Sequence, residues 1–191
     1  MPVVELRPIS RDDFPLLGGW LQEPLIAEWW HDDPAPSALE ARYGPSIDGT
    51  DRTRVLIACD HGEPVGLIQW YRLEDEPEYR AELEAAAVAV PADAVSLDYL
   101  IGPPDRRGRG FGRAMIAAAL HEVRATGASA VLVPVHAGNI ASQRVLERCG
   151  FRRVATADLE PDNPAHDRRH VVLRLDLPSG EEPGATRAGA P

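Results

Sequence analysis

A glycine-rich turn between an apolar strand and a long helix is the feature of this sequence that most limits its fold. The strand is predicted over residues 95–101, the turn over residues 107–112, and the helix over residues 113–126. Glycine permits positive φ and close approach of the backbone to a ligand. The N–H groups of such a turn can converge at the positive end of the helix dipole, and this arrangement favours a phosphate or a diphosphate.

The spacing within the turn excludes the common nucleotide-binding loops. A P-loop requires Gly-Lys-Ser/Thr, which this segment lacks. A Rossmann fingerprint follows the first strand of its domain, whereas this turn follows the fourth predicted strand. Arg106, Arg107 and Arg109 add positive charge around the glycines. A surface turn that binds nothing is the competing interpretation, and the coincidence of three arginines with a helix start disfavours it.

Hydrophobic periodicity predicts a mixed α/β fold with a central sheet and helices on its faces. The predicted strands cover residues 3–7, 54–59, 64–71, 95–101, 130–135, 151–155 and 170–175. The predicted helices run from the N-cap Ser10 to Leu21 and over residues 25–30, 38–43, 79–88, 113–126 and 139–148. We expect a single domain over residues 1–177. The Gly/Pro/Ala-rich tail, residues 178–191, is expected to be disordered.

The charge balance narrows the classes of partner. The formal net charge is −10, which argues against a nucleic-acid partner because such proteins carry a basic footprint. An acidic surface is compatible with a cationic substrate, although it also serves solubility alone. No apolar run is long enough to span a bilayer and no signal peptide is evident, so we expect a cytoplasmic protein. Cys59 and Cys149 have no metal-ligand spacing, and we expect no metal.

Two motifs in the C-terminal half resemble the GNAT superfamily of acetyltransferases. The phosphate motif of that superfamily is Arg/Gln-x-x-Gly-x-Gly/Ala, and Arg107, Gly110 and Gly112 match it between a strand and a helix. Residues 139–151 resemble a second motif, Asn-x-x-Ala-x-x-x-Tyr-x-x-x-Gly-Phe, in the expected order and spacing. The resemblance implies a single-domain GNAT fold whose sheet splays around the arm of coenzyme A. It also implies acetyl-CoA as the co-substrate.

The same resemblance indicates which residues bind the co-substrate. The amides of residues 107–112 would cradle the diphosphate of coenzyme A, and Asn139 would contact the pantetheine arm. The backbone of residues 99–101 would pair with that arm where the sheet opens. The expected set is Tyr99, Leu100, Ile101, Arg106, Arg107, Gly108, Arg109, Gly110, Phe111, Gly112 and Asn139.

The N-terminal half is similar to aminoglycoside 6′-N-acetyltransferases. Those enzymes carry Glu-Trp-Trp in the second helix and an Ile-Asp-Gln-Phe-type strand, to which residues 28–30 and 97–100 correspond. Asp98 falls on the active-site aspartate of that family, and we expect it to orient the amine and accept its proton. Siderophore-pathway acyltransferases resemble the chain almost as well, but they usually carry His at this position. The alternative role for Asp98 is an edge carboxylate paired with an arginine.

Aromatic and acidic side chains are the candidates for substrate binding. Trp29 and Trp30 can wall a sugar ring or a cation, although we expect one of them to pack in the core. Acidic residues of the segment 74–78, with Asp162 and Asp167, are candidates to clamp further ammonium groups or to form a solvated acidic surface. The expected substrate-binding set is Trp29, Trp30, Tyr43, Glu78, Asp98 and His136.

Two positions depart from the family pattern. Leu146 stands where the family has a tyrosine that is often proposed as the general acid, so no phenol can protonate the leaving thiolate from there. A second substrate-binding aspartate, expected five residues before Asn139, corresponds to Pro134. His136 lies near that position and is a candidate to replace it. A solvated loop histidine is the other interpretation of His136.

These observations predict an acetyl-CoA-dependent N-acetyltransferase that acts on a small polycationic amine, most specifically the 6′-amine of an aminoglycoside. One alternative is an acyltransferase for a lysine or hydroxylysine siderophore precursor. Another is a degenerate domain that senses acyl-CoA, which Leu146 favours. Acetylation of a protein N-terminus or lysine is disfavoured, because we expect the helical N-terminal half to cover the cleft. We expect a monomer or a homodimer, with no nucleic-acid or membrane partner.

Overall fold

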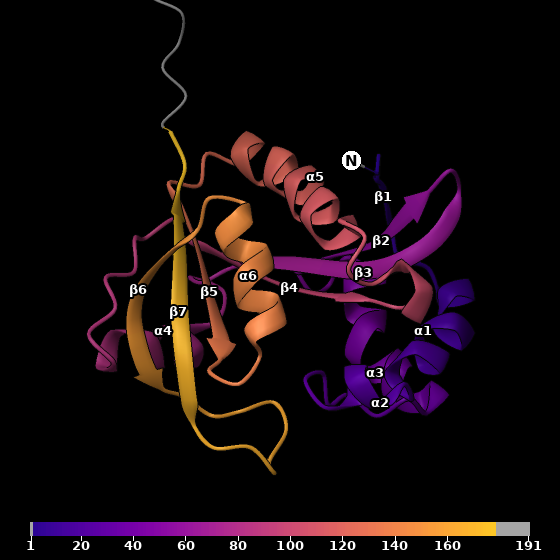
Figure 1. Cartoon of the computed structure of the whole chain (residues 1–191), viewed down its shortest axis with the longest axis horizontal. Coiled ribbons are helices and arrows are strands. Elements are labelled where there is room, and N and C mark those ends of the chain that lie inside the picture. The colour runs from indigo at the N-terminus through magenta and orange to yellow at the C-terminus, as the bar shows by residue number, and fades with distance from the viewer. Residues whose placement is uncertain (1, 179–191) are drawn as a thin grey trace, which may run out of the picture.

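The computed structural model describes residues 2–178, and the strands in this range form one seven-stranded sheet. The strand order is β1-β2-β3-β4-β5-β7-β6, and Figure 1 shows its layers. The bounds are β1 Glu5–Pro8, β2 Arg54–Asp60, β3 Glu63–Arg72, β4 Val95–Ile101, β5 Ala130–His136, β6 Arg152–Asp158 and β7 Arg169–Asp176. The mixed sheet with flanking helices confirms the predicted fold class. Residues 179–191, nearly all of the tail predicted to be disordered, lie outside the described residues.

The pairing between β4 and β5 ends almost as soon as it begins. These two strands are parallel and share a single pair in register, Val95↔Val131. On its other side β4 pairs with β3 from Val95 to Ile101. Beyond Val95, no described strand is in register with β4 on its β5 side, and the sheet opens there into a wedge. The sheet therefore splays at this point, as its resemblance to the GNAT superfamily implied.

Helices cover both faces of the sheet. Their bounds are α1 Phe14–Leu21, α2 Pro24–Ala27, α3 Pro36–Ile47, α4 Pro77–Ala85, α5 Phe111–Ala125 and α6 Ile140–Arg148. α5 and α6 pack on one face, whereas α1, α2 and α3 pack on the opposite face of β2, β3 and β4 (Figure 1). α4 packs against β5, β6 and β7. None of these helices combines the length and the apolar character that a membrane crossing requires.

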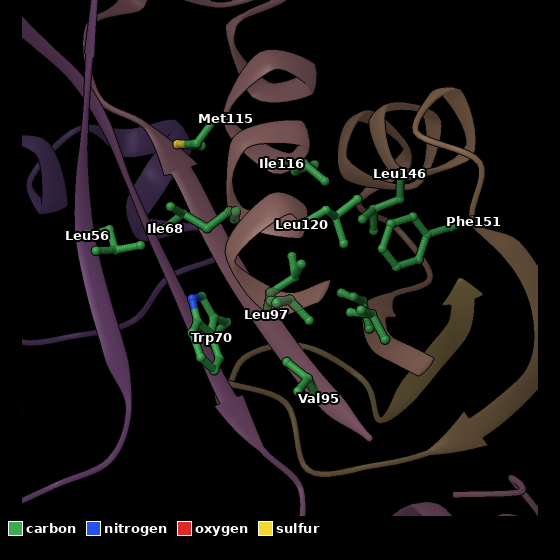
Figure 2. Packing of buried hydrophobic residues seen from close by; sticks show 14 of the residues in the cluster. Leu56, Ile68, Trp70, Val95, Leu97, Met115, Ile116, Leu120, Leu146 and Phe151 are labelled. Atoms are coloured by element: carbon green, nitrogen blue, oxygen red, sulfur yellow. The ribbon is translucent and has the colours of Figure 1, made fainter. Parts of the chain in front are cut away.

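The main core lies between α5, α6 and the sheet. Figure 2 shows Ile116 and Leu120 of α5 directed toward Leu97 of β4. Leu146 of α6 and Phe151 complete the same cluster, and the side chain of Leu146 is 0% exposed. Leucine is therefore a packing residue at the position where the family tyrosine was expected.

Several predicted helices differ in their bounds from the observed ones, and two of these differences, in α2 and α3, lie near the site. The helix predicted over residues 25–30 ends at Ala27, and a turn follows in which the N–H groups of Trp29 and Trp30 both donate to Ile26 O. The helix predicted over residues 38–43 runs from Pro36 to Ile47, because proline is well tolerated in the first helical turn. The tryptophans thus lie after a helix rather than on its face.

The fold near the site requires a glycine at position 102, because a side chain there would overlap a neighbouring ring. A Cβ at Gly102 would lie 2.1 Å from Cε2 of Trp20, whose ring is 6% exposed between α1 and the end of β4. We expect Gly102→Ala to lower the free energy of unfolding by roughly 2–3 kcal/mol, because the ring has little room to move. Denaturant unfolding measures the loss.

Gly19→Ala is the matched control for this substitution. Gly19 lies in α1, and a Cβ there would meet no atom within 4 Å. Alanine also has a higher helix propensity than glycine, so the control should be unchanged or more stable by up to about 1 kcal/mol. Equal stabilities of the two variants would contradict the packing described for Trp20.

Candidate active site

Two adjoining pockets open at the wedge between β4 and β5. The first, which we call the wedge pocket, has a volume of about 500 Å³ and extends from the glycine-rich turn to Trp29 and Trp30. The second, which we call the acidic pocket, has a volume of about 330 Å³ and is lined in part by β3 and by the segment before β7. The residues that line both pockets are Trp30, Asp98, Pro134, Asp162 and His170. These shared residues mark the junction of the two pockets.

The glycine-rich turn presents unpaired backbone donors at one end of the wedge pocket. Gly108 and Gly110 have φ of 71° and 92°, in the left-handed region that favours glycine. Within the described residues, no N–H group from Gly108 to Arg113 donates a hydrogen bond to another protein atom. These groups stand at the N-terminus of α5, where the helix dipole adds positive potential. The arrangement fits a diphosphate.

Two of the predicted arginines hold the turn in place. Arg106 pairs with Asp60 at 2.7 Å, and its guanidinium also lies over the ring of Phe111. Arg107 donates to the carbonyl oxygens of Ile101 and Gly102 at 3.1 and 2.6 Å. Both side chains also line the wedge pocket, so the prediction that their charge serves the phosphate stays a prediction.

Two arginines outside the predicted set also line the wedge pocket. Arg113 lies in the first turn of α5 and Arg148 in the last turn of α6. Neither side chain forms an ion pair with another described residue. Arg109, by contrast, is absent from the lining of the wedge pocket. A signal for Arg113 existed in the sequence, since it falls within the first turn of the predicted helix after the glycines.

The remaining predicted co-substrate residues surround the wedge. Tyr99 lines the wedge pocket, and its hydroxyl lies 2.9 Å from Ser142 Oγ. Asn139 caps α6, because its Oδ1 accepts from the N–H of Ser142 at 3.1 Å. Leu100 and Phe111 are each 6% exposed, with side chains in the hydrophobic clusters. These two residues can therefore contact a ligand through their backbones rather than through their side chains.

Asp98 lies at the junction of the two pockets. Its Oδ2 accepts a hydrogen bond from Gln69 Nε2 at 3.0 Å, across the β3–β4 pair. Burial raises the pKa of Asp98 to about 6, while the Gln69 hydrogen bond acts in the opposite direction. No arginine forms an ion pair with this carboxylate in the described range, although the charge of Arg42, which also lines the acidic pocket, acts to lower its pKa. A desolvated carboxylate that has no ion-pair partner is suited to bind a cation.

The acidic pocket gathers further carboxylates around Asp98. Glu76 and Asp162 line it, and burial raises the pKa of both groups. Asp32 also lines the pocket and is held by the Tyr43 hydroxyl at 2.6 Å and by Trp30 Nε1 at 2.9 Å. Carboxylates that line one pocket repel one another, and a cationic ligand relieves that repulsion.

Several predicted substrate contacts lie elsewhere. Tyr43 is 1% exposed and lines neither pocket, but its hydroxyl donates to Asp32, which lines the acidic pocket. Glu78 is exposed and lines neither pocket, whereas its neighbour Glu76 lines the acidic one. Among the two tryptophans, Trp30 lies at the junction and Trp29 lines the wedge pocket alone. Tyr43 and Glu78 are therefore not among the residues that line the two pockets.

The segment between β6 and β7 completes the wall of the wedge pocket. Asn163 Nδ2 donates to Glu28 O at 3.1 Å and thereby joins this segment to the N-terminal helices. His166 packs against Trp29 with ring centroids 4.8 Å apart. His136 lines the same pocket, with its ring 5.4 Å from Trp29. The N-terminal and C-terminal halves of the chain therefore both contribute to the site.

Comparison with known proteins identifies the family. A model described as an acetyltransferase (GNAT) domain matches residues 10–159. The chain belongs to the GNAT acetyltransferase family. Enzymes of this family use acetyl-CoA as co-substrate, and the unpaired amides of the turn fit the diphosphate of that molecule.

Aminoglycoside acetyltransferases are among the similar proteins. The type 1 aminoglycoside N(6′)-acetyltransferases of Klebsiella pneumoniae and Serratia marcescens are each 26% identical over 179 residues, which covers 85% of this chain and 80% of theirs. The structure of AAC(6′)-Ib in complex with coenzyme A superposes with a TM-score of 0.72 at 22% identity, covering 91% of this chain and 94% of that one. Spermidine N-acetyltransferase from Vibrio cholerae gives 0.70 at 17% identity, covering 91% and 95%. The structural likeness confirms the fold.

The position of Arg113 leads to a prediction about co-substrate affinity. We expect Arg113→Met to weaken binding of coenzyme A roughly tenfold, because a charge-assisted contact to phosphate is lost. The affinity of the variant should also depend less on salt. Calorimetric titration with coenzyme A measures both. Arg124→Met is the control, since Arg124 is exposed in the last turn of the same helix. Equal affinities of the two variants would exclude a phosphate contact at Arg113.

Proposed function

We propose that this protein transfers the acetyl group of acetyl-CoA to an amine of a small polycation, most specifically the 6′-amine of an aminoglycoside. The observation that carries the proposal is the position of Asp98 at the junction of two pockets. One pocket ends at unpaired amides that suit a diphosphate, and the other is lined by carboxylates that suit ammonium groups. The proposal joins the two pockets into one reaction path.

The turn and the wedge serve to bind and aim the donor. Amides between Gly108 and Arg113 hold the diphosphate, and the pantetheine arm follows the unpaired edge of β4 toward Asp98. Asn139 and Tyr99 lie along this path. Holding the thioester carbonyl at near-attack distance from the amine removes much of the entropic barrier to their reaction.

The acidic pocket serves to bind and orient the acceptor. A free alkylammonium has a pKa of about 10 and must lose a proton before its nitrogen can attack. Asp98 binds the reacting ammonium and aligns it with the wedge. Asp32, Glu76 and Asp162 bind other ammonium groups of the same polycation, and Trp30 provides an apolar wall for a sugar ring.

The similar proteins support this acceptor class by their names. The two 26%-identical relatives are aminoglycoside N(6′)-acetyltransferases. Solved structures of AAC(6′)-Ib, to which this chain is similar, hold paromomycin with acetyl-CoA, ribostamycin with coenzyme A, and kanamycin with coenzyme A. The spermidine acetyltransferase neighbour holds spermine. An aminoglycoside and a polyamine share several ammonium groups, which is the chemistry that the acidic pocket recognises. Whether the protein is a monomer or a homodimer stays a prediction.

One observation favours a second function, that of an acyl-CoA sensor. Leu146 packs in the core with 0% exposure, so this position offers no phenol to the leaving thiolate. The cluster of carboxylates in the acidic pocket argues against a sensor, because binding coenzyme A does not require it. Asp98 in place of histidine argues against the siderophore alternative.

A thiol-release assay with acetyl-CoA tests the proposal. We expect turnover with kanamycin, and no comparable turnover with lysine derivatives or peptides. Asp98→Ala should reduce kcat/KM for kanamycin at least about a hundredfold, because the reacting ammonium loses its partner. Calorimetry should show that this variant binds acetyl-CoA as tightly as the original chain.

Glu78→Ala is the matched control for Asp98→Ala, since it removes an exposed carboxylate that lines neither pocket. It should retain normal turnover. Turnover on lysine derivatives alone would reject the aminoglycoside acceptor. Tight acetyl-CoA binding without turnover on any amine would support the sensor instead.

The raised pKa of Asp98 predicts how activity depends on pH. The carboxylate is the form that binds an ammonium group, and its pKa is raised to about 6. The value of kcat/KM should therefore fall as the pH drops through 6, by about tenfold per pH unit at the limit. Burial also raises the pKa values of Glu76 and Asp162, so the fall can be steeper than one proton predicts. A pH profile of kcat/KM for kanamycin that is level from 5 to 7.5 would contradict the role of Asp98.

A further inference from the structure

His170 lies where the two pockets meet, and the reaction described above does not use it. This histidine belongs to β7, is 8% exposed, and lines both pockets. Pairing of β5 with β7 brings Pro134 opposite Val172, and His136 opposite His170. Because alternate residues of a strand share a face, Pro134 and His170 lie on the same face of the sheet. The ring of Pro134 carries no ionisable group, whereas His170 brings one to this face from the neighbouring strand.

The hydrogen bond of His170 determines which of its nitrogens is free. Nδ1 lies 2.9 Å from the carbonyl oxygen of Arg168. A carbonyl oxygen only accepts, so Nδ1 carries the proton of the neutral ring. The lone pair of the neutral ring is therefore on Nε2. In the described part of the chain, no group forms a hydrogen bond with Nε2.

His136, the candidate from the sequence, differs in this respect. Its Nδ1 accepts from the N–H of Gly138 at 3.1 Å. Its Nε2 lies 3.1 Å from the carbonyl oxygen of Asp167 and therefore carries the proton. Both nitrogens of the neutral His136 ring are thus satisfied by protein. His136 has no lone pair left for a substrate, and its edge-on contact with the His170 ring, at 5.5 Å between centroids, is one of packing.

We propose that His170 is a catalytic residue that accepts a proton from the reacting ammonium of the acceptor. This inference rests on the proposed function. The N–H bond of the ammonium breaks and a bond forms between that proton and Nε2. The neutral amine then attacks the thioester carbonyl, where a C–N bond forms, and the C–S bond breaks as the thiolate leaves. Nε2 returns its proton to the thiolate, and the second proton of the nitrogen passes to Asp98 and then to solvent.

The position of His170 fits both steps of this proton transfer. The acidic pocket holds the ammonium on one side, and the wedge pocket holds the thioester sulfur on the other. Proton return from His170 also supplies the function of the phenol that Leu146 cannot provide. The catalytic histidine and the binding carboxylate thereby divide two tasks, because a carboxylate that stabilises an ammonium also makes it harder to deprotonate.

Charged and titratable groups from several elements surround His170. Asp98 on β4 and Asp162 before β7 line both pockets with it, and His170 influences the pKa of Asp162. On the β5 side its neighbour is His136, which contacts His166 and Asp167. Across the β6 pair it faces Ala157, which does not titrate. Arg42, Glu76 and Glu160 share the acidic pocket with His170, whereas the two aspartates share both pockets with it.

His170→Asn is the variant that tests the proposal, because its side-chain N–H can still donate to Arg168 O while Nε2 is removed. With kanamycin and acetyl-CoA, we expect kcat to fall by about 10²–10³-fold. The dissociation constant of acetyl-CoA and the KM for kanamycin should change less than about threefold, since neither depends on proton transfer. The pH profile of kcat should lose one ionisation. The fall of kcat/KM at low pH, which comes from Asp98, should persist.

His121→Asn is the control, since His121 is exposed on α5 and lines neither pocket. It should keep the original kcat. His170→Ala should regain rate in proportion to added imidazole, which a structural role would not allow. A His170→Asn variant with normal kcat and an unchanged pH profile would overturn the proposal and leave the proposed function standing.

A measurement that needs no turnover distinguishes failure of the His170 proposal from failure of the proposed function. Nitrogen-edited NMR of the unaltered protein should show His170 as the neutral ring protonated at Nδ1. A neutral ring protonated at Nε2 would overturn the proposal even in an active enzyme. Failure of the unaltered protein to acetylate any amine would overturn the proposed function, and with it the role of His170.

Discussion

The early end of the pairing between β4 and β5 is the constraint on which the site depends. One pair in register, Val95↔Val131, joins the two halves of the sheet at this point. Every further residue of β4 keeps its pairing with β3 but leaves its other edge without a strand. Backbone donors and acceptors exposed in this way need a partner, and an extended ligand can supply one. The wedge, the turn at its end and the acidic pocket beside it all follow from this opening.

The rest of the chain holds the wedge open. The core on one face fastens α5 to β3 and β4, and the N-terminal helices cover the opposite face. Trp20 covers Gly102 at the end of β4, and Arg107 binds the carbonyl oxygens at that same end. Asn163 links the segment before β7 to Glu28 across the pocket. These contacts lie at the end of β4 and at the segment before β7, both of which border the wedge pocket.

The electrostatics of the acidic pocket work against folding and in favour of binding. Burial raises the pKa of Asp98, Glu76 and Asp162, which means that their charged forms are less stable here than in water. Stability from these groups is present at low pH and is lost as the pH rises through their folded pKa values. A polycation reverses this cost by pairing with the carboxylates. The pocket thus has its greatest affinity for cations at the pH at which it destabilises the empty fold.

The sequence determined those features of the protein that depend on local chain chemistry. Glycines at 108 and 110 encode the left-handed turn, the apolar periodicity encodes the strands and helices, and Asp98 in an apolar strand indicated a charged group with a role. Tertiary structure alone decided which side chains meet. Arg106 and Arg107 turn to protein acceptors, Tyr43 is buried behind Asp32, and His170 arrives beside Asp98 from a strand more than seventy positions later in the chain. Contacts between distant segments depend on strand order and on where pairing ends, and neither is encoded in the spacing of neighbouring residues.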